Sequence, residues 1–248
     1  MRSVALVEVA LGDGVRAGFT TRDGGTSAPP WASLNLGLHV GDATEHVLAN
    51  RARVAGWVGA PVAFATQVHG AGVATLGGPP APGELTVGEY DGLVTVSPDV
   101  AVAVLVADCA PVLLADPEAR VVGAAHVGRV GLVSGVLKAT LAAMVARDAR
   151  ADRVRAVVGP CIAGGSYEVP AAMRDEVAAA VPDVAATTAW GTPALDLAAG
   201  ARAVLRRAGV EHVRVDGRDT LVDGDLFSYR RAAGRPTGRF AGVGRLLP

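Results

Sequence analysis

Three residues with metal-binding side chains, His69, Cys109 and His126, each follow directly on an apolar stretch of the sequence. Short Val-rich runs are typical of buried strands, and polar residues at strand ends are where enzymes place their chemistry. Two imidazoles and one thiolate form the ligand set of a catalytic zinc ion whose fourth position is open. We therefore predict one metal site at these residues, able to act on a bound substrate.

The spacing of these residues excludes a zinc finger or a zinc ribbon. The intervals from 69 to 109 and from 109 to 126 are far wider than those between ligands of such structural sites. The ligands can meet only if three strand ends converge, which a sheet can arrange. Gly70 and Gly128 would allow a loop to approach the metal closely. The alternative is that Cys109 is an ordinary buried thiol.

The composition indicates a folded and nearly neutral chain. Half of the 248 residues are hydrophobic and 19% are charged, which excludes general disorder. The net charge of −1 predicts no binding to nucleic acid or to a membrane, and no stretch is long enough to cross a bilayer. The two cysteines, 109 and 161, form no disulfide framework, and the N-terminus resembles no secretory signal. We expect a cytoplasmic protein.

The apolar pattern predicts strands and helices that interleave along the chain. We expect helices at 43–57, with Thr44 as the N-cap, and at 132–146, 170–180 and 195–208. We expect strands at 15–21, 62–68, from about 91, and at 100–108, 121–125, 154–158 and 212–215. Residues 77–83, rich in Gly and Pro, predict a surface loop. The pattern favours a single α/β (mixed α+β) domain over residues 1–248, with mixed β-sheets flanked by helices.

A series of short motifs runs in order from about residue 18 to residue 240. They are Thr21–Ser27, Ser33–Gly37, His39–Asp42, Asn50–Arg51, Gln67–Gly70, Asp91–Thr95, Ala107–Pro111, Ala125–Gly128, Gly159–Ile162, Tyr167–Val169 and Phe227–Arg231. The series resembles the bacterial laccase-domain family, also called the polyphenol oxidase or peptidoglycan-editing-factor family.

This resemblance implies a zinc-dependent purine nucleoside phosphorylase that also deaminates adenosine and cleaves methylthioadenosine. It implies a fold similar to the cysteine-hydrolase-like fold of deamidating bacterial toxins, and metal ligands at His69, Cys109 and His126. Three departures stand out: Gly128-Arg129-Val130-Gly131 replaces the family's Gly-Trp-Arg-Gly, Asp219 replaces a frequent Cys, and Val127 replaces Ala. We expect the first to affect substrate choice or rate more than the metal site.

Phosphorolysis requires an anion cradle that holds phosphate in line with the anomeric carbon, and the planar donor fork of arginine suits it. The resemblance makes Arg51 the leading candidate, both for catalysis and for phosphate binding; the alternative is a solvated charge on a helix face. Arg22, beside a Gly-rich loop, and Arg129, close to His126, are further candidates. Arg230 and Arg231 rank below these candidates, because they could instead form a surface pair.

Other polar residues have two open interpretations. Asp108 either orients a ligand or binds substrate, or else it caps the turn before Pro111. Tyr167 either stacks on a purine or serves packing. We do not expect Cys161 to be a fourth ligand, because it would close the metal site. His39 is expected to line the pocket, and the remaining two histidines, at 46 and 212, to lie on the surface.

The expected partners are a purine nucleoside and phosphate, bound by a monomer or a homodimer. One alternative is a metal-free hydrolase with Cys109 as nucleophile and His126 as base. Another is a non-catalytic protein that edits cell-wall precursors. Copper is possible by the family's name, but five histidines cannot supply both a blue-copper and a trinuclear centre. Zinc is the favoured metal.

Overall fold

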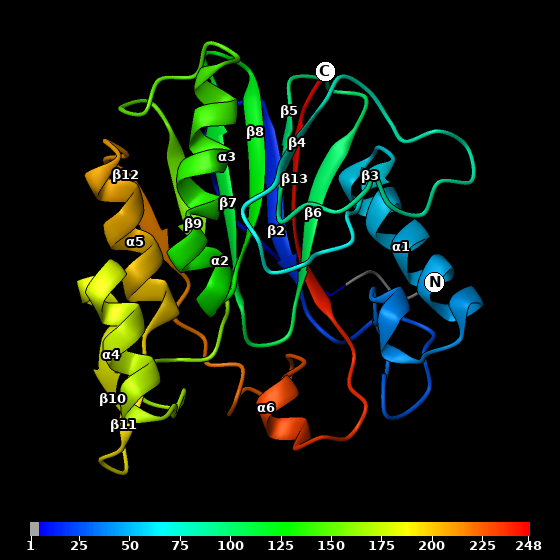
Figure 1. Cartoon of the computed structure of the whole chain (residues 1–248). Helices are drawn as coiled ribbons and strands as arrows, with labels where there is room; N and C mark the ends of the chain where they lie inside the picture. Colours follow the sequence, from blue (N-terminus) through cyan, green and yellow to red (C-terminus); the bar gives the residue numbers. More distant parts are fainter. Residues whose placement is uncertain (1–4) are drawn as a thin grey trace.

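The computed structural model describes residues 5–248, which form two mixed β-sheets (Figure 1). The five-stranded sheet has the order β1 (Leu6–Glu8), β2 (Val15–Thr20), β13 (Phe240–Leu246), β6 (Ala101–Val106) and β3 (Val62–Ala63). The six-stranded sheet has the order β12 (His212–Val215), β9 (Arg155–Val158), β7 (Ala110–Asp116), β8 (Val121–Val127), β5 (Gly92–Thr95) and β4 (Val73–Leu76). A separate hairpin joins β10 (Ala185–Thr187) and β11 (Pro193–Leu195).

Helices cover the outer faces of both sheets. Figure 1 shows α1 (Thr44–Val58) on one side of the molecule, and α2 (Arg129–Ser134), α3 (Val136–Val145), α4 (Ala171–Ala180) and α5 (Leu197–Arg207) on the other. The short helix α6 (Tyr229–Ala232) lies below the sheets, and two 3-10 turns are Leu38–Val40 and Pro182–Val184. The predicted α/β fold with mixed sheets flanked by helices is confirmed.

The strand β6 shows why the sequence reads as continuous apolar runs. Ala103 and Leu105 pack with Val54 of α1 on the outer face. Val102 and Val104 point the other way, and they pack with residues of the six-stranded sheet in a core between the two sheets. Because both faces of the central strands β6, β7 and β8 are buried, neither face needs polar residues, and the alternation of a half-exposed strand is absent there.

Four expectations about the elements need correction. The helix predicted at 132–146 is two helices, because Gly135 adopts φ +89° between α2 and α3. Thr44 is not an N-cap: Ala43 occupies that position without a side-chain cap. The strand expected to run from 62 to 68 ends at Ala63. The pattern also missed several strands, notably β7 and β13.

The loop predicted over residues 77–83 contains no helix or strand, as expected. Within residues 5–248, none of the helices has both the length and the apolar character that crossing a bilayer requires.

Candidate metal centre

The structure brings His69, Cys109 and His126 together at one end of the two sheets. One potential ligand atom from each residue lies within 4.8 Å of the other two. His69 follows β3 in a turn, and Cys109 lies in the connection by which the chain crosses from β6 to β7. His126 is the second-last residue of β8 and is buried, whereas the His69 side chain is exposed. The three residues meet as the sequence predicted; metal binding by them stays a prediction.

Asp91 positions two of these three residues, and the sequence interpretation missed it. The carboxylate is buried and accepts hydrogen bonds from the backbone N–H groups of Val68 (3.2 Å), His69 (3.0 Å) and Gly70 (2.6 Å). It also lies 2.8 Å from Nδ1 of His126. Nδ1 therefore carries the proton that is donated to Asp91, and Nε2 of His126 is left to face the ligand group.

Backbone geometry also brings the ligand residues close to each other. His69 has φ +60° and Asp108, beside Cys109, has φ +95°, values that non-glycine residues rarely adopt. A Cβ atom on Gly128 would lie 3.1 Å from both Sγ of Cys109 and Cδ2 of His69. Glycine at 128 thus leaves room for the ligand atoms to converge.

The protonation behaviour of the three ligand residues matches their proximity. Burial acts to raise the pKa of the Cys109 thiol, but the charge and hydrogen bonds of His126 and His69 outweigh it and lower the pKa to about 6. Burial acts to lower the pKa of His126, but Cys109 and Asp91 raise it to about 9. A thiolate beside two imidazoles is a donor set that zinc favours, and ligand atoms around tetrahedral zinc are roughly 3.5 Å apart. The residues therefore fit a zinc ion after a small inward movement.

Cys161 contrasts with Cys109. It is 5% exposed, packs in the apolar core on the helix side of the six-stranded sheet, and lies outside the ligand group. Burial raises the pKa of its thiol above the ordinary value, so the thiol stays protonated.

The ligand group opens into a cavity of about 410 Å³, a size within the usual range for small-molecule sites. Apolar residues form part of its wall, including Ile162, Tyr167 and Leu197. His39 lines it, as expected, and Tyr167 lines it as well. The remaining lining residues are Gln67, His69, Leu105, Val106, Ala107, Asp108, Cys109, His126, Tyr229, Arg230 and Arg239.

The three arginines that the sequence favoured do not line this cavity. Arg51 is 9% exposed; its Nε donates to Leu36 O (3.0 Å), its Nη1 donates to Leu85 O (2.8 Å), and its guanidinium lies 4.0 Å from the centre of the Phe64 ring. Arg51 therefore takes neither of the two positions that the sequence suggested, a phosphate-binding one or a solvated one, because these contacts hold its side chain against the backbone of two loops. Nε of Arg22 donates to Ala32 O (2.9 Å), and the Arg22 guanidinium lies over the Phe227 ring. Arg129 is the first residue of α2.

Arg230 and Arg239 line the cavity instead. Arg230 lies 5.2 Å from the centre of the Tyr167 ring and donates to Glu168 O (3.1 Å). The sequence interpretation ranked Arg230 below the other arginines, as part of a possible surface pair, and did not consider Arg239. Only the position of 230 within the Phe227–Arg231 motif hinted at its place.

Asp108 lines the cavity, but both of its carboxylate oxygens already accept hydrogen bonds from other groups of the protein. They accept hydrogen bonds from Thr220 Oγ1 (2.6 Å) and from the backbone N–H of Arg230 (2.7 Å). Asp108 therefore fastens the C-terminal segment over the cavity, which neither of its two sequence interpretations anticipated.

A two-sheet α/β fold with a His–Cys–His group facing a cavity defines a candidate metalloenzyme. The family model described as "Multi-copper polyphenol oxidoreductase laccase" matches residues 16–246, and the chain belongs to this family. It is 47% identical over 232 residues to a purine nucleoside phosphorylase of Mycobacterium bovis, covering 92% of this chain and 91% of the relative. It is 50% identical over 227 residues to a purine nucleoside phosphorylase of Streptomyces griseus, with 90% and 91% covered.

The fold is likewise similar to a solved structure from this group. The crystal structure of Neisseria meningitidis protein NMB0706 superimposes with a TM-score of 0.86 at 35% identity, covering 98% of this chain and 99% of the other. Among residues 5–248, His69, Cys109 and His126 form the one such group of converging potential ligands. The names of the relatives thus point to an enzyme acting on nucleosides, while the family's description points to copper.

Proposed function

We propose that this protein is a zinc-dependent purine nucleoside phosphorylase that also deaminates adenosine. The observation that carries the proposal is the convergence of His69, Cys109 and His126 at a cavity that also contains arginine side chains. The printed names of the relatives support the same reaction class. The proposed substrates are adenosine, inosine or methylthioadenosine, together with phosphate.

His69, Cys109 and His126 would hold the ion, and three protein donors are one fewer than a closed structural zinc site requires. A zinc ion bound there supplies Lewis acidity to a substrate atom without requiring a redox change. Asp91 holds a proton on Nδ1 of His126, so Nε2 is the nitrogen that would give up its proton to a metal, and the ring would then serve as a neutral ligand.

The cavity wall provides a place for the purine. Ile162 and Leu197 are apolar, and the Tyr167 ring can stack on a base. In phosphorolysis a phosphate oxygen forms a bond to C1′ while the bond from C1′ to the base nitrogen breaks, and the electron pair leaves with the base. Burial raises the pKa of Tyr167, so the ring that would stack on the base stays uncharged at neutral pH.

The attacking phosphate needs positive charge nearby. Arg230 and Arg239 supply it from the C-terminal segment, and their planar guanidinium groups suit phosphate oxygens. Holding phosphate and nucleoside in one cavity replaces a bimolecular encounter by an oriented one.

The test is to incubate the zinc-loaded protein with adenosine and phosphate and to separate the products by chromatography. Adenine and ribose 1-phosphate report phosphorolysis, and inosine reports deamination. His126→Ala is expected to abolish both, whereas His212→Ala, which removes an exposed histidine on β12, is expected to retain them. Circular dichroism of both variants verifies the fold. Unchanged turnover in His126→Ala would remove the metal centre from the mechanism.

One observation favours a second function, a metal-free hydrolase. A thiol whose pKa is lowered to about 6, beside a histidine whose pKa is raised, is also the arrangement of a cysteine nucleophile and its base. The two functions differ in the effect of zinc, because metal would silence a free nucleophile and is required by the phosphorylase.

A further inference from the structure

A second, smaller cavity adjoins the one that contains the candidate metal ligands. Its volume is about 260 Å³. His39, Tyr229 and Arg239 line both cavities. A molecule bound at the metal ligands can therefore extend past these three side chains into the smaller space, whose other lining residues are Val40, Gly234, Arg235, Pro236 and Thr237.

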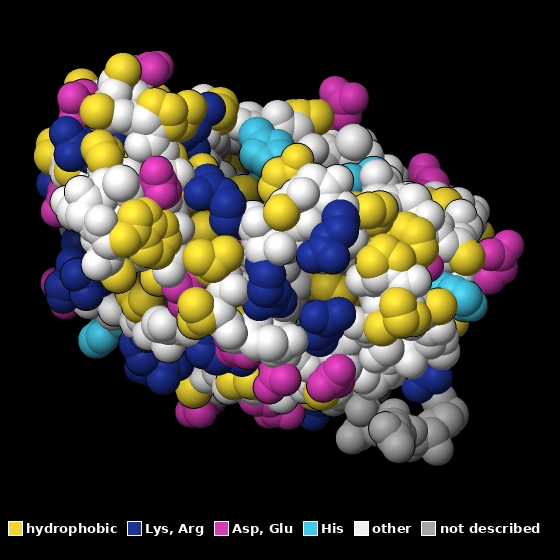
Figure 2. All heavy atoms as spheres, turned by 90° about the horizontal axis from the view of Figure 1, so that it is seen from below, with side chains coloured by type: hydrophobic (Ala, Val, Ile, Leu, Met, Phe, Trp, Pro, Cys, Tyr) yellow, Lys and Arg dark blue, Asp and Glu magenta, His cyan; other side chains and the backbone are white. Residues whose placement is uncertain are grey.

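The arginines around this passage have no carboxylate partner. Arg230, Arg235 and Arg239 form no ion pair within 4.0 Å with any Asp or Glu of the described chain. The single carboxylate among the lining residues of both cavities, Asp108, already accepts two hydrogen bonds. Figure 2, which shows the molecule from the side where α6 lies, has several basic side chains gathered around hydrophobic ones. Unpaired positive charge at a passage attracts an anionic group.

Arg239 is held in place by contacts that are distant in the sequence. Its backbone N–H donates to Oδ1 of buried Asn35 (2.9 Å), and its stem packs where a Cβ atom on Gly37 would come within 2.9 Å of Cγ. Nη1 donates to Thr237 O (3.2 Å) and Gly238 O (3.0 Å). Nε and Nη2 make no hydrogen bond to residues 5–248, so they are available to a ligand.

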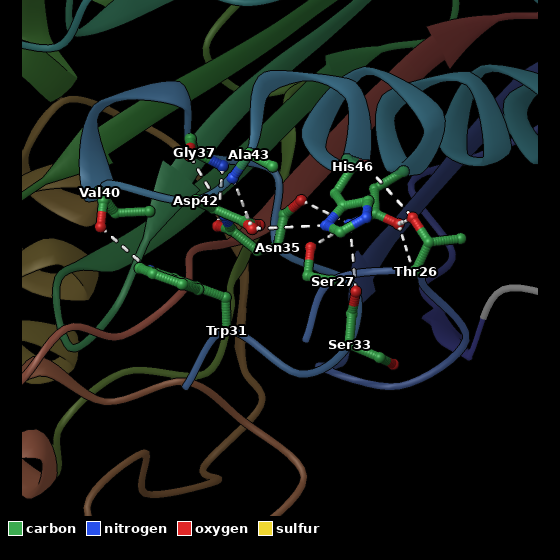
Figure 3. Close-up of polar contacts among 11 residues, drawn as sticks. Thr26, Ser27, Trp31, Ser33, Asn35, Gly37, Val40, Asp42, Ala43 and His46 are labelled. Carbon is green, nitrogen blue, oxygen red and sulfur yellow. Dashed lines mark hydrogen bonds and ion pairs between the residues drawn. The ribbon is translucent and has the colours of Figure 1, made fainter. Parts of the chain in front are cut away.

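The loop that carries His39 is fixed by the same asparagine. Figure 3 shows Asn35 near Gly37 and Asp42, and the Nδ2 of Asn35 donates a hydrogen bond to the Asp42 carboxylate at 2.9 Å. The same figure shows Trp31, whose Nε1 donates to Val40 O at 3.0 Å. The wall formed by His39 and Arg239 is therefore a built surface of the cavity. Besides burial, the charge of Arg239 lowers the pKa of His39, which places a neutral imidazole at this wall at neutral pH.

The two flanks of the larger cavity suggest how a nucleoside lies in it. Leu197 begins α5 on one flank of the sheets, whereas His39 precedes α1 on the other flank (Figure 1). A purine placed against Leu197, Ile162 and Tyr167, with its ribose beside the metal ligands, would direct the 5′ end of the ribose toward His39 and Arg239.

We infer that the smaller cavity is a subsite for a phosphoryl group on the 5′ position of the ribose, so that nucleoside 5′-monophosphates bind where nucleosides bind. This inference rests on the proposed function. Arg235 would contact the phosphoryl oxygens, since guanidinium groups pair with phosphate through charge-assisted hydrogen bonds. Arg239, which lines both cavities, would lie between this phosphoryl group and the co-substrate phosphate.

The test measures adenosine 5′-monophosphate as an inhibitor of adenosine phosphorolysis by the zinc-loaded protein, and as a substrate by chromatography. Competitive inhibition is expected, and Arg235→Gln is expected to raise the inhibition constant roughly tenfold, the effect of losing one hydrogen bond to a charged group. Arg147→Gln, an equal charge change at an exposed residue beyond α3, is the matched control and is expected to leave the constant unchanged. An inhibition constant that is the same in Arg235→Gln and in the wild type overturns the inference.

Free phosphate is the other source of a phosphoryl anion. If Arg235→Gln raises the KM for inorganic phosphate and leaves the affinity for the nucleotide unchanged, the smaller cavity holds the co-substrate and the inference is wrong. Calorimetric titration of the nucleotide into the same proteins needs no turnover. A protein that binds the nucleotide through Arg235 but turns over no adenosine would contradict the proposed function while supporting the subsite.

Discussion

The two sides of the cavity are positioned by different kinds of contact. On the side of the metal ligands, the pairing of strands positions the side chains. Gly92 of β5 pairs with Ala125 of β8, which places the neighbouring residues Asp91 and His126 side by side. On the cationic side, Arg239 depends on Asn35, a residue 204 positions away that belongs to a loop. An apolar run in the sequence indicates a buried strand, whereas a hydrogen bond between two distant loops leaves no comparable pattern. The first side is therefore open to prediction from the sequence, and the second is not.

The largest expected effect separates the two cysteines in protein stripped of metal. Cys109 is expected to react with iodoacetamide at least about a thousandfold faster than Cys161 at pH 7, because only the thiolate is nucleophilic and Cys161 is buried and protonated. The pKa of Cys109 is lowered, so its thiolate persists above pH about 6 and is lost below it. Peptide mass spectrometry across pH measures both rates.

Zinc provides the control for that experiment. Bound zinc is expected to protect Cys109 from alkylation, because coordination occupies the sulfur lone pair that would attack iodoacetamide, and to leave the rate at Cys161 unchanged. Equal rates for the two cysteines would break the comparison, since they would mean that sheet pairing does not create a distinct environment at 109.

Asp91→Asn tests the sheet-borne side directly. The amide keeps the size of the side chain but loses the charge that orients His126 and one of the two acceptor oxygens, so that either His69 N–H and His126 or Gly70 N–H loses its acceptor. Zinc affinity is therefore expected to fall about 10–100-fold. Competition with a chromophoric chelator measures it. Asp116→Asn is the matched control: Asp116 is equally buried, but it lies at the other end of β7 from Cys109 and binds Arg153.

The control should also lose stability in a way that depends on pH. Hydrogen bonds and Arg153 lower the pKa of Asp116 despite its burial, so its contribution to stability is present above the unfolded pKa and disappears as the pH falls through the folded one. Zinc affinity unaffected by Asp91→Asn, or reduced as much by Asp116→Asn, would contradict the role of Asp91.

A pair of arginine variants sharpens the contrast on the cationic side. Arg51→Met is expected to lower the free energy of unfolding by about 1–3 kcal/mol, because the buried carbonyl of Leu36 and the carbonyl of Leu85 lose their donor, and to change the KM for phosphate little. Arg239→Gln is expected to raise that KM about tenfold. Urea denaturation and initial rates measure the two effects. A raised KM without loss of stability in Arg51→Met would return Arg51 to the site.

These arginines show where sequence reasoning stops. The apolar runs before Cys109 and His126 fix buried strands, so the convergence of the ligand residues could be predicted. The direction of the Arg51 side chain could not, because its partners Leu36 and Leu85 lie on separate loops. The break at Gly135 was missed for a related reason: the apolar pattern continues across it, and only the backbone conformation interrupts the helix.

The smallest expected effect repeats the comparison at two helix starts. Helix α5 begins with a local cap, since Asp196 Oδ1 accepts from Ala199 N (2.8 Å), and Asp196→Ala is expected to cost about 1 kcal/mol. Helix α1 begins instead at a loop held by Asn35 and Asp42, whose Oδ1 accepts from the Ala43 N–H at 2.8 Å. Thr44→Ala is therefore expected to change the free energy of unfolding by less than about 0.5 kcal/mol in urea denaturation. If Thr44→Ala instead lowered the free energy of unfolding about as much as Asp196→Ala, the start of α1 would depend on its own side chains. The cationic side of the cavity would then depend less on contacts between distant loops than its hydrogen bonds indicate.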